Sequence, residues 1–128
     1  MLTVMVKCEL AIPVKLIKLP PNTSIEHKAK VCSKIIKTVC NFYDVKYEKV
    51  LSTITWRGAH IKAVSSVIYA LTEIGIERHV VARLIKKQPQ TIATNLYRLR
   101  KRIRNVAYKK EFICCITLIK KEIAPHFS

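Results

Sequence analysis

The chain has 128 residues, of which half are hydrophobic and a quarter are charged. This composition is typical of one folded globular domain rather than of a disordered tail. The sequence contains only two glycines, Gly58 and Gly75, so it can form neither the GxGxxG turn of dinucleotide-binding folds nor the GxxxxGK[ST] phosphate loop. Nucleotide binding through either motif is therefore excluded.

The charge is strongly unbalanced, because 24 Lys and Arg stand against 8 Asp and Glu and give a formal net charge of +16. Such a chain repels itself, and nucleic acid is the expected polyanionic partner, with an anionic membrane surface second. No apolar run approaches the roughly 20 residues that span a bilayer. Lys7 and Glu9 interrupt the first apolar stretch, unlike a signal peptide. We therefore expect no membrane partner and a cytoplasmic protein.

Residues for catalysis or metal binding are scattered. The sequence has no CxxC pair and no matching histidine spacing for zinc, so the cysteines are expected to be reduced thiols. Asp44 and Glu48 stand one helical turn apart, as acids at a helix start often do. We expect no enzyme, no metal, no cofactor and no small-molecule substrate. The residues considered are Cys8, Cys32, Cys40, Cys114, Cys115, His27, His60, His79 and His126.

The first 22 residues are predicted to form an extended arm or an edge strand, because they are rich in β-branched residues but are broken by Pro13 and closed by Pro20 and Pro21. Thr23 and Glu26 then form a capping box, with Thr23 accepting from the Glu26 amide, that opens a helix through about residue 41. The apolar stripe predicted for this helix consists of Ile25, Ala29, Cys32, Ile36, Val39 and Cys40.

Two further helices and a loop are predicted in the middle of the chain. A short helix runs from Asp44 to about residue 51, and a basic loop around Trp56 and Gly58 follows it. A longer helix, from about residue 60 to 74, ends at Gly75, which suits the residue after a helix C-terminus. Its predicted apolar face consists of Ile61, Val64, Ile68 and Leu71.

The segment 76–105 is predicted to be a helix-turn-helix. Its first helix, 76–86, has Val80, Val81, Leu84 and Ile85 on its apolar face. Its second helix starts at Pro89, a residue favoured in the first turn. Apolar residues recur in that helix at Ile92, Leu96, Leu99 and Ile103, a stripe that has to pack on the rest of the domain. The stretch 78–110 contains eleven Lys and Arg and no acid.

These features predict a helix that enters the DNA major groove, where Gln and Asn pair with adenine, Arg pairs with guanine and the Thr methyl group packs on thymine. The candidates for reading bases are Gln90, Thr91, Thr94, Asn95 and Arg98. The candidates for contacting the DNA backbone are Arg83, Lys86, Lys87, Arg100, Lys101, Arg102 and Arg104. A solvated helical pair is the simpler alternative, and an RNA-binding or ribonucleoprotein component is another.

The C-terminal segment, 106–128, contains an unbroken apolar run at 112–119 that suits either a buried helix or a strand. A helix of this kind needs a cover, either from the arm at 1–19 or from a second copy of the chain in a homodimer. A partner-protein or membrane-surface contact through this segment is a third reading. The predicted organisation is thus an arm at 1–22, a helical core at 23–105 and a packing or oligomerisation segment, in a mainly α, compact bundle.

Residues 39–51 contain a helix that ends in an aromatic pair and is followed by a short helix, and residues 66–73 lie in a long helix. Together with 81–85 and the pair Thr91 and Ile92, these segments resemble the C-terminal DNA-binding domain of the bacterial replication initiator DnaA, a Trp-repressor-like helix-turn-helix. In that family, 81–85 corresponds to the motif Ile-Gly-x-x-Phe, and Thr91 with Ile92 corresponds to the end of the signature Asp-His-[Ser/Thr]-Thr-Val. The resemblance implies a sequence-preferring double-stranded DNA-binding protein in replication or transcription control, of viral, mobile-element or accessory type. It places Arg57 and Lys62 in a basic loop at the backbone or minor groove.

Overall fold

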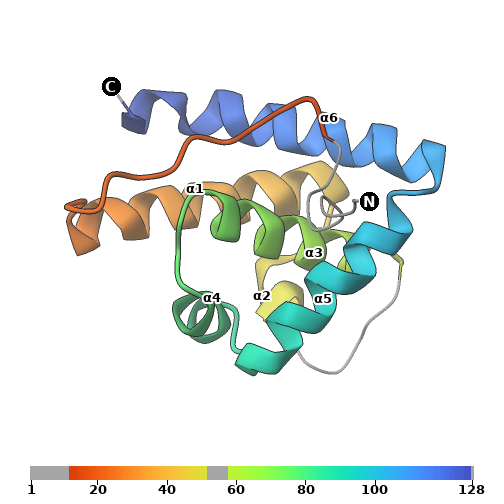
Figure 1. Ribbon diagram of the computed structural model, residues 1–128, viewed down its shortest axis with the longest axis horizontal. Helices are drawn as coiled ribbons and strands as arrows, with labels where there is room; N and C mark the ends of the chain where they lie inside the picture. Colours follow the sequence, from red (N-terminus) through yellow and green to blue (C-terminus); the bar gives the residue numbers. More distant parts are fainter. Residues whose placement is uncertain (1–11, 52–57, 128) are drawn as a thin grey trace, which may run out of the picture.

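The computed structural model describes residues 12–51 and 58–127, which form a helical bundle without a strand (Figure 1). This confirms the predicted mainly α fold class. No helix within these residues is long and apolar enough to cross a membrane. The elements are α1 (Ile25–Tyr43), α2 (Tyr47–Leu51), α3 (Gly58–Glu73), α4 (Arg78–Leu84), α5 (Pro89–Arg102), α6 (Val106–Ile123) and a terminal 3₁₀ turn, η2 (Ala124–Phe127).

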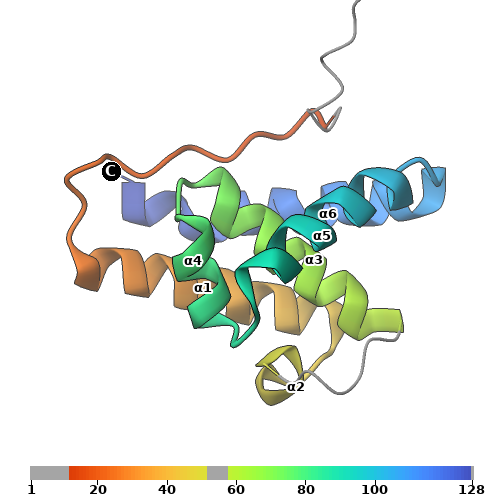
Figure 2. The same ribbon diagram turned by 60° about the horizontal axis from the view of Figure 1, so that its bottom comes forward.

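The centre of the bundle is α3, in which every residue from Ala63 to Leu71 is buried. A helix that is buried all round needs neighbours on all its sides. α1 and α6 pack on α3 and on each other, whereas α4 and α5 pack together and on α3 (Figure 2). Helix α3 therefore separates the α1 side of the molecule from the α5 side.

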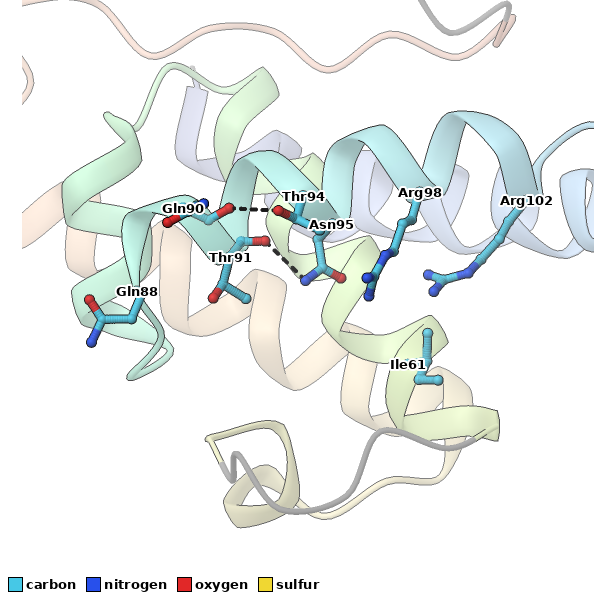
Figure 3. Close-up of a pocket in the computed structure, with 8 residues that line it drawn as sticks. All are labelled: Ile61, Gln88, Gln90, Thr91, Thr94, Asn95, Arg98 and Arg102. Carbon is cyan, nitrogen blue, oxygen red and sulfur yellow. Dashed lines mark hydrogen bonds between the residues drawn. The ribbon is translucent and has the colours of Figure 1, made fainter.

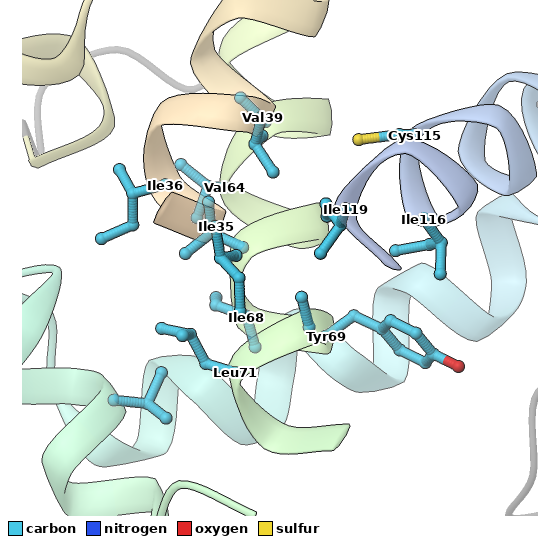
Figure 4. Close-up of a cluster of buried hydrophobic side chains, with 14 of the residues drawn as sticks. Ile35, Ile36, Val39, Val64, Ile68, Tyr69, Leu71, Cys115, Ile116 and Ile119 are labelled. Carbon is cyan, nitrogen blue, oxygen red and sulfur yellow. The ribbon is translucent and has the colours of Figure 1, made fainter. Parts of the chain in front are cut away.

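The apolar run in the C-terminal segment is helical, and it completes the core (Figure 4). Phe112, Ile116 and Ile119 are fully buried, at the spacing of one helix face. The Phe112 ring meets Tyr69 of α3 edge-on, with 5.1 Å between the ring centroids. Because α1 and α3 cover this apolar surface, a homodimer through 106–128, one of the two covers predicted for it, is not needed to bury it.

The N-terminal arm is extended and pairs with no strand among the residues described. It crosses the outside of the bundle towards the start of α1 (Figure 1), and it contributes Ile12 and Leu16 to the core. The Leu19 amide donates to the Ile74 carbonyl oxygen over 2.9 Å. Between residues 12 and 22 the segment is thus an arm rather than an edge strand; the earlier part of the prediction lies outside the described residues.

The start of α1 differs from the prediction. Ser24, not Thr23, is the N-cap, and its hydroxyl accepts from the His27 amide over 3.1 Å. The Thr23 hydroxyl instead donates to the Pro20 carbonyl oxygen over 2.6 Å, which closes the turn after the arm. The Thr23 side chain is therefore committed to the preceding turn.

The buried face of α1 is also broader than one stripe. Ile25 is 85% exposed and Ala29 is exposed, whereas the unpredicted Val31 and Ile35 are fully buried. Because α1 packs on both α3 and α6, it buries residues on two adjoining faces. The predicted apolar stripe was too narrow because it allowed for one neighbouring helix and not for two.

Two predicted helices are shorter because residues near their ends cap a neighbour. Asp44 is the C-cap of α1, with φ of 54°, so α2 begins later, at Tyr47. Asn105 is the N-cap of α6, where its side-chain oxygen accepts from the Tyr108 amide over 2.9 Å, so α5 ends at Arg102. Short polar side chains at these positions compete with helix continuation.

Helix α4 is also shorter than the predicted 76–86 and packs differently. Ile76 is buried ahead of the helix, and Leu84 is 36% exposed although it was predicted to be apolar core. Gly75 ends α3 as expected, with φ of 97°, a conformation that glycine adopts without steric cost.

The helical packing of the C-terminal run predicts that mutations at two nearby positions change the free energy of unfolding by very different amounts. Phe112→Ala removes a fully buried ring and should lower the free energy of unfolding by about 3–5 kcal/mol. Cys114→Ala changes an exposed side chain and should alter it by less than about 0.5 kcal/mol. Urea unfolding followed by circular dichroism measures both. Equal losses would contradict the helical register, since positions 112 and 114 share a face only in a strand.

Candidate nucleic-acid interface

Helices α4 and α5 are joined by the turn 85–88, within the range predicted for the helix-turn-helix. Val81 and Ile85 are fully buried and fix the first helix to the core. The Lys87 amide donates to the Ala82 carbonyl oxygen over 2.8 Å. Lys86 has φ of 56°, a conformation in which glycine is the usual residue. A long cationic side chain therefore occupies the one position of this turn where a side chain carries a steric cost.

Helix α5 has a packed face and an outward face. Ile92 and Leu99 are buried against the bundle. The apolar residues Ile92, Leu96, Leu99 and Ile103 follow one another at intervals of four, three and four residues. The same intervals, counted from Gln90 two positions earlier, give a polar row on the opposite side of the helix. That row consists of Gln90, Thr94, Tyr97 and Lys101, of which Thr94 is half-buried and the others are exposed.

Tyr97 was not among the predicted site residues, although it lies in the middle of this row. Its ring is 54% exposed, and the Lys101 ammonium lies 4.6 Å from its centroid. Hydrogen bonding to Lys101 and the charge of that lysine lower the pKa of Tyr97. The repeat that starts at Gln90 was the sequence signal that could have found this exposed aromatic side chain.

A groove of about 630 Å³ lies between α5 and the start of α3 (Figure 3). All five predicted base-reading residues line it, so the structure brings this set together. The lining residues are Ile61, Gln88, Gln90, Thr91, Thr94, Asn95, Arg98 and Arg102.

Within this set, Asn95 is a correction. Its side chain is 6% exposed: the amide nitrogen donates to the Thr91 carbonyl oxygen over 3.1 Å, and the amide oxygen accepts from the Ser65 hydroxyl over 3.4 Å. The Arg102 guanidinium also donates to the Ser65 hydroxyl, over 3.2 Å. Position 95 lies three residues after Ile92, so its side chain stands at the edge of the groove that adjoins the bundle. Asn95 therefore holds α5 against α3 and is not available to read a base.

The predicted backbone-contacting residues fall into several groups. Lys87 is half-buried, and burial lowers the pKa of its ammonium. Arg100 follows Arg98 by two residues, about 200° round the helix, so it lies away from the groove. The exposed members are Arg83, Lys86, Arg100, Lys101 and Arg104, together with Arg98 among the base-reading residues.

Of the two predicted minor-groove residues, Lys62 is the one that the structure describes. The Lys62 ammonium pairs with the Glu111 carboxylate over 3.0 Å and lies 5.6 Å from the centroid of the Tyr108 ring. Lys62 is therefore directed towards α6. Arg57 and Trp56 lie outside the described residues, so the basic loop stays a sequence prediction.

The electrostatics of the groove are one-sided. Helix α5 has no acid in its first turn, and its N-cap, Gln88, forms no side-chain cap. The partial positive charge of a helix N-terminus thus adds to the cations along this face. Among the residues that the structure describes, no three His, Cys, Asp or Glu side chains gather to hold a metal ion. The groove can attract an anion and offers amide and hydroxyl groups beside it.

Comparisons with protein-family models, with curated proteins and with solved structures found no match to this chain.

The burial of Asn95 predicts a structural role for its side chain. Asn95→Ala leaves the Ser65 hydroxyl without its amide acceptor and should lower the free energy of unfolding by about 1–3 kcal/mol. Thr94→Ala, next to it, removes a hydroxyl that bonds only within α5, to the Gln90 carbonyl oxygen, and should change it by less than about 0.5 kcal/mol. Thermal and urea unfolding of the two variants provide the measurement. A stable Asn95→Ala protein would return Asn95 to the base-reading set.

Proposed function

We propose that this protein binds double-stranded DNA with a sequence preference and inserts α5 into the major groove. The observation that carries the proposal is the outward face of α5, where amide and hydroxyl side chains lie beside a groove and are surrounded by cations without an acid. A solvated helical pair accounts for the charge but not for this row of short polar groups at the start of the helix.

The side chains divide by their reach. Gln90 and Thr94 lie near the N-terminus of α5, the part of a recognition helix that reaches base edges. Gln can pair with adenine, and the Thr methyl group packs on thymine. Arg98, one turn further, suits a guanine edge, and the Tyr97 ring suits an apolar contact with a thymine methyl or a sugar. Lys101 and Lys86 lie on either side of this set and are assigned to phosphates.

The resemblance to the C-terminal domain of DnaA supports the same docking mode, and with it a role in replication or transcription control. Such a protein would act on the nucleoid, or on viral DNA in the host cytoplasm. RNA binding is the second candidate, because Tyr47 and Tyr97 are about half exposed and aromatic rings stack on unpaired bases. DNA is favoured because the major groove of duplex DNA admits a helix, whereas that of A-form RNA is deep and narrow.

The direct test is selection of bound sequences from a random duplex DNA pool, with matched pools of duplex and single-stranded RNA. Enrichment of a DNA motif is the expected outcome, and binding to every duplex should weaken steeply with salt because phosphate contacts release counterions. Enrichment only in the single-stranded RNA pool would replace the proposal with the RNA alternative. Affinity that does not change with salt would contradict both.

Mutations of base-contacting and phosphate-contacting residues should have different effects on DNA binding. Gln90→Ala should reduce discrimination between the selected site and a scrambled one by about 1–3 kcal/mol, with little effect on the scrambled duplex. Lys101→Gln should weaken both duplexes equally and reduce the slope of log affinity against log salt by about 0.9. Titrations at four salt concentrations measure both effects. If the two variants behaved alike, α5 would be a charged surface and not a reading helix.

Because Lys86 has a positive φ, replacing it should affect the stability of the protein and its affinity for DNA in different ways. Lys86→Gly relieves the positive φ and should leave the free energy of unfolding unchanged or raise it by up to about 1 kcal/mol. The same variant should weaken every duplex and lower the salt slope by about 0.9 if Lys86 meets a phosphate. Lys49→Gln, on the exposed surface of α2, is the control for the loss of one positive charge elsewhere on the protein. Binding by Lys86→Gly at the unmodified level would remove the turn from the interface.

A further inference from the structure

The net charge of the chain comes from two stretches. Residues 78–110 contain eleven Lys and Arg and no acid, and residues 12–43 contain six Lys against one acid, Glu26. The remaining stretches, 1–11, 44–77 and 111–128, each contain equal numbers of basic and acidic residues. The excess charge of +16 therefore divides into +11 and +5.

The two charged stretches lie on different sides of the bundle. The larger one includes α4 and α5, and the smaller one includes the arm and α1. Helix α3 packs against α1 and against α5 and lies between them (Figures 1 and 2). A duplex seated on α5 would therefore leave the outer surface of α1 uncovered.

That surface, here called the α1 face, consists of Lys18, Lys30, Ser33, Lys34, Lys37 and His126. A shallow hollow of about 480 Å³ is lined by Ser33, the three α1 lysines, His126 and Ala29. His126 also lines a neighbouring hollow of about 520 Å³ together with Lys18 of the arm. The basic surface is thus continuous from the arm to α1.

The lysines of the α1 face can reach separate phosphates of one duplex. Lys30 and Lys37 are seven residues apart, about 10.5 Å along a helix, and duplex DNA carries a negative charge about every 1.7 Å along its axis. Lys34 lies between them and pairs with Glu122 over 3.4 Å. Within the part of the chain that the structure describes, neither Lys30 nor Lys37 has an acidic partner. Their charges are therefore open to a polyanion.

We propose that the α1 face binds the phosphate backbone of a second duplex, so that one molecule bridges two DNA segments. The inference rests on the proposed function of α5, which supplies the first contact. Ser33 is the one short polar side chain that lines the lysine hollow, so this second contact is expected to be independent of sequence. An anionic membrane fits less well, because Ile17 and Ile25 are two separate exposed hydrophobic side chains and do not form the broad apolar helix face that inserts into a bilayer.

A bead-capture experiment tests the bridge with the full chain. A biotinylated duplex carrying the selected site is immobilised and saturated with protein, the excess is washed away, and a fluorescent duplex of unrelated sequence is added at about 0.1 M salt. The unmodified protein should capture the second duplex. Lys30→Gln with Lys37→Gln should reduce that capture by roughly 10- to 100-fold, because two phosphate contacts are lost. Affinity for the first duplex should change by less than about threefold, since α5 is untouched.

Lys46→Gln with Lys49→Gln is the matched control, because it removes two exposed charges, one just before α2 and one within it, and should leave capture intact. Capture of the second duplex by the α1 variant would overturn the proposal. A bridge made by two self-associated protein molecules would overturn it too, and sedimentation would reveal that bridge as two protein copies in each DNA complex. Loss of binding to anionic vesicles in the α1 variant, with no DNA capture by the unmodified chain, would assign the face to membranes instead. Failure of the first duplex to bind would count against the function proposed for α5.

Discussion

The burial of α3 on all sides is the constraint on which the rest of the molecule depends. Nine consecutive residues of this helix are withdrawn from water, and each of its faces therefore needs an apolar partner. α1 and α6 cover one part, and α4 and α5 cover another. The same packing sets the directions in which the charged surfaces of α1 and α5 face. A change in the α3 core would therefore disturb both surfaces together.

Electrostatics oppose this compact state. Two ion pairs occur among the described residues, those of Lys34 and Lys62, and the His79 ring lies 3.5 Å from the Glu77 carboxylate; all these side chains are more than a third exposed. Pairs of this kind contribute little, typically between 0 and about 1 kcal/mol each. The hydrophobic core has to offset the self-repulsion of a +16 chain. A bound polyanion would relieve that repulsion, which links the stability of this protein to the partner proposed for it.

The position of α5 depends on both apolar and polar contacts. Ile92 and Leu99 bury one face of the helix, while the Asn95, Ser65 and Arg102 side chains form a hydrogen-bonded contact with α3 beside the groove. Apolar packing tolerates small rotations of a helix, whereas a hydrogen-bonded contact specifies one arrangement. This polar contact would fix the rotation of α5 and with it the direction of Gln90 and Thr94. The Lys86 turn adds a second local constraint at the other end of the helix.

The sequence by itself determined the mainly α class, the approximate positions of the helices and the segregation of charge, because periodicity, Gly75 and Pro89 are local signals. It also placed Gln90, Thr91, Thr94 and Arg98 together beside the groove of α5. Only the tertiary structure decided that the run after Phe112 is a helix, because helix and strand bury a continuous apolar run equally well until a neighbour of definite shape is present. It also withdrew Asn95 from the surface, since its burial depends on Ser65, thirty residues away in the chain. Helix rotation and long-range pairing are set by what each side chain packs against, and no local pattern contains that information.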